Sequence, residues 1–195
     1  MRYLGESKKV VIVGIAGVGK TTLVSKIVEI LNSKKKSVSV HSFGTVMFEE
    51  AKKLGIENRD ELRKLSVEEQ KELQKMAAKK IASFNHNIVI IDTHAFISTK
   101  EGFYPGLPSQ VLAELKPANL ITVSARPEEI YNRRMKDTTR ERDIISIESI
   151  KKELSVQEAM LSSCAVITGS PMKSILNSEG KVEEAANEVI NAIGL

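Results

Sequence analysis

The most constraining feature of the sequence is an apolar run that leads directly into a glycine-rich turn and then into a segment with helical periodicity. Residues 10–13 are all Val or Ile, and the pattern Gly14-x-x-x-x-Gly19-Lys20-Thr21 follows at once. This spacing is that of a P-loop, in which glycines let consecutive backbone N–H groups converge on a phosphate. The helix that follows adds its free amides and the positive end of its dipole. The sequence therefore predicts a nucleoside triphosphate site.

The turn and the first helical residues supply the predicted phosphate contacts. We expect Lys20 to reach the β- and γ-phosphates and the Thr21 hydroxyl to hold Mg²⁺. Asp92 ends a continuous apolar run over residues 88–91, which is typical of a strand buried in a parallel sheet. A carboxylate at that position in a P-loop protein is expected to support the same Mg²⁺. The predicted ATP phosphate-binding residues are Gly14, Ala16, Gly17, Val18, Gly19, Lys20, Thr21 and Thr22.

Size and composition favour one globular domain over residues 1–195. The chain has 195 residues, of which 42% are hydrophobic and 28% are charged. No apolar run approaches the roughly 18 residues that a membrane span needs, and no stretch of signal-peptide type opens the chain. The single cysteine, Cys164, excludes an internal disulfide, and no Cys/His cluster suggests zinc. We therefore expect a cytoplasmic protein with no membrane partner.

Strand-like and helix-like segments alternate, which predicts an α/β fold with a five-stranded parallel sheet covered on both faces, a three-layer arrangement. The strands are expected at residues 10–13, 37–43, 88–92, 120–123 and 173–177. Residues 45–85 carry only helical patterns, including a capping box that starts at Ser66, so we predict an inserted helical lobe over about residues 43–85. Residues 93–108 are rich in Gly and Pro and are predicted to form a long functional loop.

The densest positive charge follows a helix that Pro127 opens. Its members are Arg133, Arg134, Lys136, Arg140 and Arg142, interleaved with three acidic residues. One interpretation is a solvated charged surface. The other is a short lid, about residues 136–144, whose guanidinium groups contact the transferring phosphoryl group, because the planar fork of arginine binds phosphate oxygens in pairs. We favour the lid and predict that the catalytic residues are Lys20, Arg133, Arg140 and Arg142.

The sequence shows no obvious general base and no covalent nucleophile. Phosphoryl transfer between two phosphates needs neither, because positioning and charge neutralisation supply most of the catalysis. An acceptor phosphate that is already ionised would suit this set of residues, and a nucleoside monophosphate in the helical lobe would fit. The lid would exclude water, so that transfer would outpace hydrolysis.

Taken together, these residues resemble the archaeal-type adenylate kinases, which belong to the P-loop nucleoside monophosphate kinases. The similarity extends over nearly the whole chain and is carried by the P-loop residues 14–22, the Arg-Asp-Glu-Leu-Arg-Lys-Leu run at 59–65, Asp92-Thr93-His94 with the Pro-Gly-Leu-Pro run at 105–108, and Arg133 with Asp137, Arg140, Arg142 and Asp143. Many nucleotide-binding proteins share the P-loop, whereas the Asp-Thr-His and Pro-Gly-Leu-Pro runs together are much more specific.

The resemblance implies the reversible Mg²⁺-dependent reaction of ATP with AMP to give two ADP, a small lid without zinc, and commonly a homotrimer. It implies that Arg133, Arg140 and Arg142 contact the phosphates in transfer and that Asp92 orients Mg²⁺ through water. The AMP-binding residues that it implies are Phe43, Gly44, Arg59, Arg63 and His94.

Three positions depart from the family pattern without removing a phosphate ligand. Ala16 replaces a usual proline, Thr45 replaces an aspartate after Phe-Gly, and Phe103-Tyr104 stands where Tyr-Leu is more usual. Of these, Thr45 bears on the specificity for the monophosphate.

Three other function classes share some of these features. A GTPase would carry Asp-x-x-Gly after the third strand, but Asp92 is followed by Thr-His-Ala. A P-loop ATPase that assists RNA–protein assembly stays open because the net charge is +4. Nucleic acid is not favoured as a partner, because single-stranded RNA binders usually carry stacking aromatics and only 4% of these residues are aromatic. A kinase for another nucleoside monophosphate is the third alternative.

Overall fold

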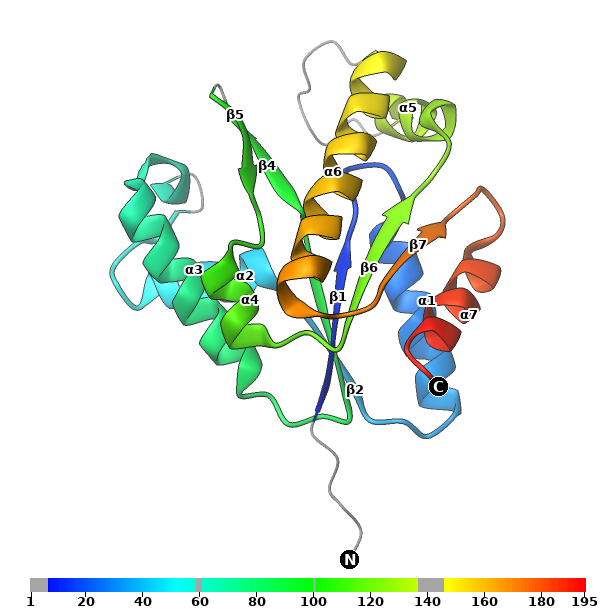
Figure 1. The fold of residues 1–195 in the computed structure, drawn as a ribbon, viewed down its shortest axis with the longest axis horizontal. Coiled ribbons are helices and arrows are strands. Elements are labelled where there is room, and N and C mark those ends of the chain that lie inside the picture. Colours follow the sequence, from blue (N-terminus) through cyan, green and yellow to red (C-terminus); the bar gives the residue numbers. More distant parts are fainter. Residues whose placement is uncertain (1–6, 59–60, 100, 137–145) are drawn as a thin grey trace, which may run out of the picture.

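A parallel sheet of five strands, in the order β2-β3-β1-β6-β7, forms the centre of the protein (Figure 1). The structure is a computed structural model that describes residues 7–58, 61–99, 101–136 and 146–195. The strands of the sheet are β1 (Lys8–Val13), β2 (Val38–Ser42), β3 (Ile88–Thr93), β6 (Asn119–Ser124) and β7 (Met172–Leu176). The predicted five-stranded parallel sheet is therefore confirmed.

Strand β1 lies in the middle of this sheet and pairs in parallel with β3 on one side and β6 on the other. Residues 10–13 have no solvent-exposed surface, because both faces of the strand are covered. This explains why the strand has a continuous apolar sequence rather than an alternating one. The register pairs Val13 with Thr93, so the chain leaves β1 and β3 at the same edge of the sheet.

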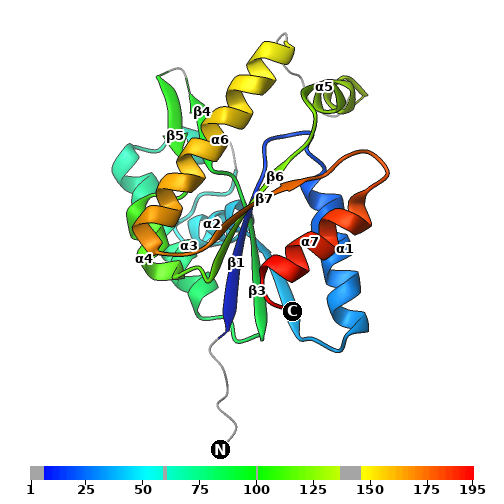
Figure 2. The same ribbon diagram turned by 45° about the vertical axis from the view of Figure 1, so that its right-hand side comes forward.

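Helices cover both faces of the sheet (Figures 1 and 2). On one face, α1 (Lys20–Ser33) packs against α7 (Val182–Ala192). The other face carries α3 (Val67–Ala82), α4 (Ser109–Leu115) and α6 (Ile147–Thr168). Helix α5 (Pro127–Lys136) lies beyond the carboxyl ends of the strands and packs against α6. In the part of the chain that the structure describes, no helix combines the length and the apolar character that crossing a bilayer requires.

The segment predicted as a helical lobe holds α2 (Phe43–Lys52), the short 3₁₀ helix η1 (Glu61–Lys64) and α3. Ser66 caps α3 as predicted, because the Glu69 N–H donates to Ser66 Oγ at 3.3 Å and the Ser66 N–H donates to Glu69 Oε2 at 2.8 Å. Helix α2 begins directly after β2 at Phe43, whose ring is buried in the core.

The prediction of a loop over residues 93–108 is wrong, because this segment contains a β-hairpin. Strand β4 (Phe96–Thr99) pairs antiparallel with β5 (Gly102–Pro105). The rings of Phe96 and Phe103 pack edge to face across the hairpin, with their centroids 4.8 Å apart. Gly102 has a φ of +130°, which only glycine adopts readily, so the glycine that suggested a loop instead serves the turn.

Candidate nucleotide-binding site

The P-loop connects the carboxyl end of β1 to the start of α1. Gly17 and Gly19 have φ angles of +89° and +80°, a region that glycine enters without steric cost. At Gly14 an added Cβ would lie 2.7 Å from Val18 Cγ2, so this position also has no room for a side chain. No side chain caps the N-terminus of α1. The turn and the helix therefore present backbone amides to the same region, which is the arrangement that binds phosphate.

Three successive carbonyl groups of the P-loop accept hydrogen bonds from side chains of distant segments. Arg134 Nε donates to Ala16 O at 2.8 Å, a guanidinium N–H of Arg133 donates to Gly17 O at 3.3 Å, and Asn177 Nδ2 donates to Val18 O at 2.8 Å. We call the side chains of Arg133, Arg134 and Asn177 the P-loop collar. In a planar trans peptide the N–H lies opposite the C=O. Holding the Ala16 and Val18 carbonyls therefore turns the N–H groups of Gly17 and Gly19 the other way.

Arg134 is the most buried charged member of the collar, with 7% of its surface exposed. Both terminal guanidinium nitrogens face the Glu153 carboxylate on α6, at 2.6 and 3.4 Å. A buried charge requires such a partner, because desolvation would otherwise be costly. Arg133 is less buried, and it lies 3.9 Å from the Glu129 carboxylate and donates to Asn177 O at 3.4 Å.

Lys20 and Asp92 meet at the carboxyl edge of the sheet. Lys20 is the first residue of α1, Asp92 lies near the end of β3, and Lys20 Nζ contacts the Asp92 carboxylate. Thr21 follows Lys20 on an exposed part of the helix. A hydroxyl and a carboxylate are the oxygen donors that Mg²⁺ prefers, and Mg²⁺ commonly uses one or two protein ligands with substrate phosphates and water. The residues present therefore fit Mg²⁺, although the described residues contain no cluster of three or more His, Cys, Asp and Glu side chains.

The remaining predicted site residues are less fully described. Gly44 is exposed at the start of α2, and His94 is exposed directly after β3. The Phe43 ring is buried in the core, so its predicted contact with AMP would have to come from the backbone. The predicted residues that lie outside the described part of the chain, wholly or by their side chains, are Arg59, Arg63, Arg140 and Arg142, together with most of the predicted lid.

Comparisons with known proteins show the family of the chain. Residues 13–151 match a family described as an AAA domain. An adenylate kinase from Methanocaldococcus jannaschii is 43% identical to this chain over 190 residues, which cover 96% of this chain and 99% of that protein. The chain belongs to the adenylate kinase family. An adenylate kinase from Thermoplasma acidophilum is 42% identical over 186 residues, covering 95% of this chain and 98% of that protein.

Membership of the adenylate kinase family makes this protein a phosphotransferase enzyme. Its fold has a wider distribution, because a shikimate kinase from Acinetobacter baumannii in complex with shikimate superposes with a TM-score of 0.61. That structure is 14% identical in sequence, and the match covers 96% of this chain and 93% of the other. At this identity the likeness shows the shared fold alone.

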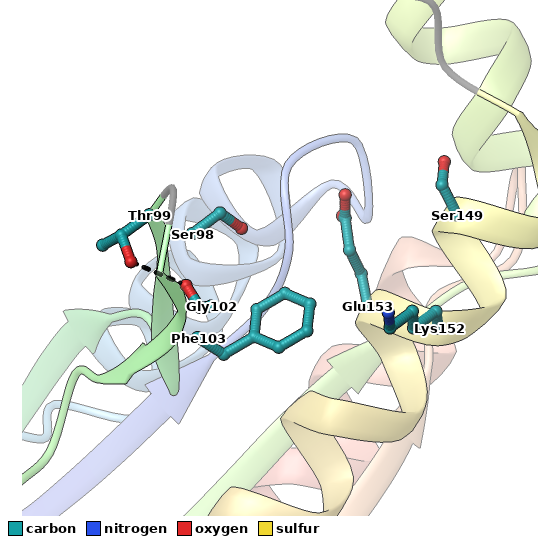
Figure 3. Close-up of a pocket in the computed structure, with 7 residues that line it drawn as sticks. All are labelled: Ser98, Thr99, Gly102, Phe103, Ser149, Lys152 and Glu153. Carbon is teal, nitrogen blue, oxygen red and sulfur yellow. Dashed lines mark hydrogen bonds between the residues drawn. The ribbon is translucent and has the colours of Figure 1, made fainter.

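A cleft of about 350 Å³ lies between the β4–β5 hairpin and α6 of this adenylate kinase family member (Figure 3). Phe103 and Glu153 face it from opposite walls, and Lys152 Nζ lies 5.8 Å from the centroid of the Phe103 ring. The described residues that line the cleft include none of the predicted site residues. Glu153 also binds Arg134, which donates to Ala16 O, so one wall of the cleft is linked to the P-loop through these two side chains.

Sequence reasoning missed three residues that contact the P-loop or support it, namely Arg134, Glu153 and Asn177. In the sequence Arg134 is only one member of a charged run, and the resemblance assigns the phosphate role to its neighbour Arg133. Asn177 follows the last strand without any motif around it. No local pattern could have identified the donors, because the carbonyls that they bind lie more than 100 positions away in the chain.

Proposed function

We propose that this protein catalyses the reversible transfer of the terminal phosphoryl group of ATP to AMP, which gives two ADP. The observation that carries the proposal is the contact of Lys20 Nζ with the Asp92 carboxylate beside the P-loop. It joins a cation suited to the β- and γ-phosphates with a carboxylate suited to Mg²⁺. The 43% identity to an adenylate kinase over nearly the full length of both chains supports AMP as the acceptor.

In the proposed reaction, an oxygen of the AMP phosphate bonds to the γ-phosphorus while the bond from the γ-phosphorus to the β–γ bridging oxygen breaks. No base is needed, because a phosphate monoester has a second pKa of about 6 and is largely dianionic at neutral pH. The P-loop amides and Lys20 bind the donor phosphates, so Lys20 exchanges its contact with Asp92 for one with phosphate oxygens. Bound Mg²⁺, held by Thr21 and through water by Asp92, would neutralise charge on the β- and γ-phosphates.

The acceptor side of the proposal follows the family resemblance. AMP would bind at the helical lobe of residues 43–85, and the residues assigned to it are Phe43, Gly44, Arg59, Arg63 and His94. A lid over residues 136–144 would bring Arg140 and Arg142 to the transferring phosphoryl group, where Arg133 would join them. Guanidinium groups suit this role because they pair with phosphate oxygens in a fixed planar geometry.

We also propose that the protein is a cytoplasmic homotrimer, as the resemblance implies. The chain mass is 21.5 kDa, so a trimer would have three times that mass, 64.5 kDa. Light scattering coupled to size-exclusion chromatography measures this mass directly. A species of 21.5 kDa across the accessible concentrations would contradict the proposed assembly.

A coupled assay of ADP formation from ATP and Mg²⁺ tests the function. The acceptors are AMP, CMP, UMP, GMP and none, each at several concentrations. We expect rapid ADP formation with AMP and a rate at least tenfold lower with every other acceptor, because discrimination against a wrong base comes from groups left unpaired in the site. Equal ADP release without any acceptor would favour the ATPase alternative. Preference for another monophosphate would leave the reaction class intact and overturn the assignment of AMP.

A further inference from the structure

Two carbonyl groups of the P-loop are bound by buried side chains that play no part in the proposed phosphate contacts. Ala16 O accepts from Arg134 Nε, and Val18 O accepts from Asn177 Nδ2, each at 2.8 Å. Arg134 and Asn177 are 7% and 5% exposed, so both are held in the protein interior. Glu153 in turn binds Arg134 through both carboxylate oxygens.

These contacts restrict the conformational freedom of the glycine-rich turn. Gly17 and Gly19 permit the conformation that binds phosphate, but glycine also permits many others. If the peptide between Ala16 and Gly17 rotated, it would present a carbonyl oxygen to the phosphate and repel it. A hydrogen bond from a charged donor such as Arg134 is stronger than one between neutral groups, so it holds the productive orientation before the nucleotide arrives.

Space around the turn limits the alternatives further. A Cβ at Gly17 would lie 3.1 Å from both Arg134 Cγ and Ile130 Cγ2, and a Cβ at Gly19 would lie 2.6 Å from Asn177 Nδ2. The side chains that bind the carbonyls therefore also pack directly against the two glycines. Tight packing on the outer side leaves little room for the turn to relax away from the phosphate.

We propose that Arg134, held by Glu153, and Asn177 are positioning residues that fix the P-loop amides toward the donor phosphates and thereby tighten the binding of ATP. They act through the backbone of residues 16–19 and do not contact the nucleotide. The proposal rests on the proposed function for its kinetic readout. Its binding readout uses ATP alone and does not depend on the identity of the acceptor.

The first test is calorimetric titration of MgATP into the full chain without any acceptor. Because a hydrogen bond from a charged donor is stronger than one between neutral groups, we expect Arg134→Met to weaken ATP binding at least about tenfold. Asn177→Ala should weaken it about fivefold, because its donor is neutral. The ATP affinity of Arg134→Lys should lie between that of Arg134→Met and that of the unchanged protein, because lysine keeps the charge and loses the planar fork.

A thermodynamic cycle tests whether Glu153 acts through Arg134. Glu153→Gln alone should weaken ATP binding by about threefold, because Arg134 keeps its carbonyl contact but loses its charged partner. In the Arg134→Met background, Glu153→Gln should cause no further loss. A second loss of the same size in that background would show that Glu153 acts independently and would overturn its part of the proposal.

Steady-state kinetics separates positioning from a general structural role. We expect the KM for ATP to rise in the Arg134 and Asn177 variants and the KM for AMP to stay within about twofold, because the lost contacts lie at the P-loop. Matched controls are Met135→Ala, at a side chain 62% exposed on the same helix as Arg134, and Glu158→Gln, at an exposed carboxylate on the same helix as Glu153. Neither control should change ATP binding.

Urea unfolding shows which variants are folded. If Arg134→Met does not fold, ATP binding by Arg134→Lys and Asn177→Ala still tests the proposal. ATP binding within twofold of the unchanged protein in folded Arg134 and Asn177 variants would overturn the proposal. An equal rise in the KM for ATP and the KM for AMP would overturn it as well, because it would indicate a general loss of structure. If the unchanged protein binds ATP but transfers nothing to AMP, the proposed function fails and the titrations still decide the positioning role.

Discussion

Replacing Gly106 by alanine should test how closely the base of the β4–β5 hairpin packs. An added Cβ at Gly106 would overlap the carbonyl oxygen of His94, and it would lie 3.0 Å from His94 C and 3.2 Å from Ala95 C. All three are backbone atoms, so no side-chain rotation can relieve the overlap. The Gly106 N–H also donates to Ala95 O at 2.8 Å, which ties the two segments together at the same point.

The size of the effect follows from these contacts. Ordinary van der Waals contact requires the two backbone segments to separate by roughly 1 Å. The separation would break or stretch the Gly106–Ala95 hydrogen bond, at a cost of about 1 kcal/mol. Overpacking in a fitted interior costs about 1–3 kcal/mol more. We therefore expect Gly106→Ala to lower the free energy of unfolding by about 3 kcal/mol, which for a chain of this size is roughly 6–12 °C in Tm.

Urea unfolding followed by circular dichroism measures this loss, and a thermal scan gives Tm. The matched control is Gly44→Ala, because a Cβ there meets nothing within 4 Å and the position lies in α2. That substitution should leave stability unchanged or raise it by up to about 1 kcal/mol, since alanine favours helix over glycine. A Gly106→Ala variant with the unfolding midpoint of the unchanged protein would refute the close backbone approach on which the reasoning depends.

Three further predictions concern single side chains. Lys20→Ala should lower kcat by about 10²–10³ in the coupled assay without loss of the folded circular dichroism spectrum, and unchanged turnover would contradict the role of Lys20. Burial raises the pKa of the Cys164 thiol, so iodoacetamide should label Cys164 far more slowly in the folded protein than in urea, and equal rates would refute this. Hydrogen bonds from Ser66 lower the pKa of Glu69 from 4.5, so the stability that they contribute is present above pH 4.5 and is lost as pH falls through the folded-state pKa. Glu69→Gln should therefore lower the urea midpoint most near pH 7 and progressively less below pH 4.5, whereas a pH-independent difference would argue against this linkage.

The features that the sequence predicted well depend on residues close together in the chain. The P-loop spacing, the capping box of Ser66 and the apolar run of β3 are each complete within one short segment. Their physical causes are local, because glycine φ angles, helix capping and strand burial on both faces each restrict the residue types within one short segment. The meeting of Lys20 with Asp92 was also predictable, since the carboxyl ends of parallel strands share one edge of the sheet.

Other features depend on contacts between distant segments. Arg133 and Arg134 are adjacent, and which of them turns toward the interior is decided by the packing of α5 against the P-loop and α6, not by either residue type. The hairpin was missed for a different reason. Gly102 and Pro105 are typical of loops, but they stand here at the turn and at the end of an edge strand, where both are tolerated.

The central position of β1 in the sheet determines which parts of the protein unfold first on heating. The phosphate-binding turn extends from the middle strand of the sheet, whereas the helices assigned to the acceptor follow β2, an edge strand whose Val40 is 39% exposed. Local opening begins where backbone hydrogen bonds are least protected, and hydrogen exchange should therefore be faster in β2 than in β1. Warming would then abolish binding of the acceptor AMP before binding of the donor ATP. Partly opened molecules would still bind ATP but would not transfer its phosphoryl group.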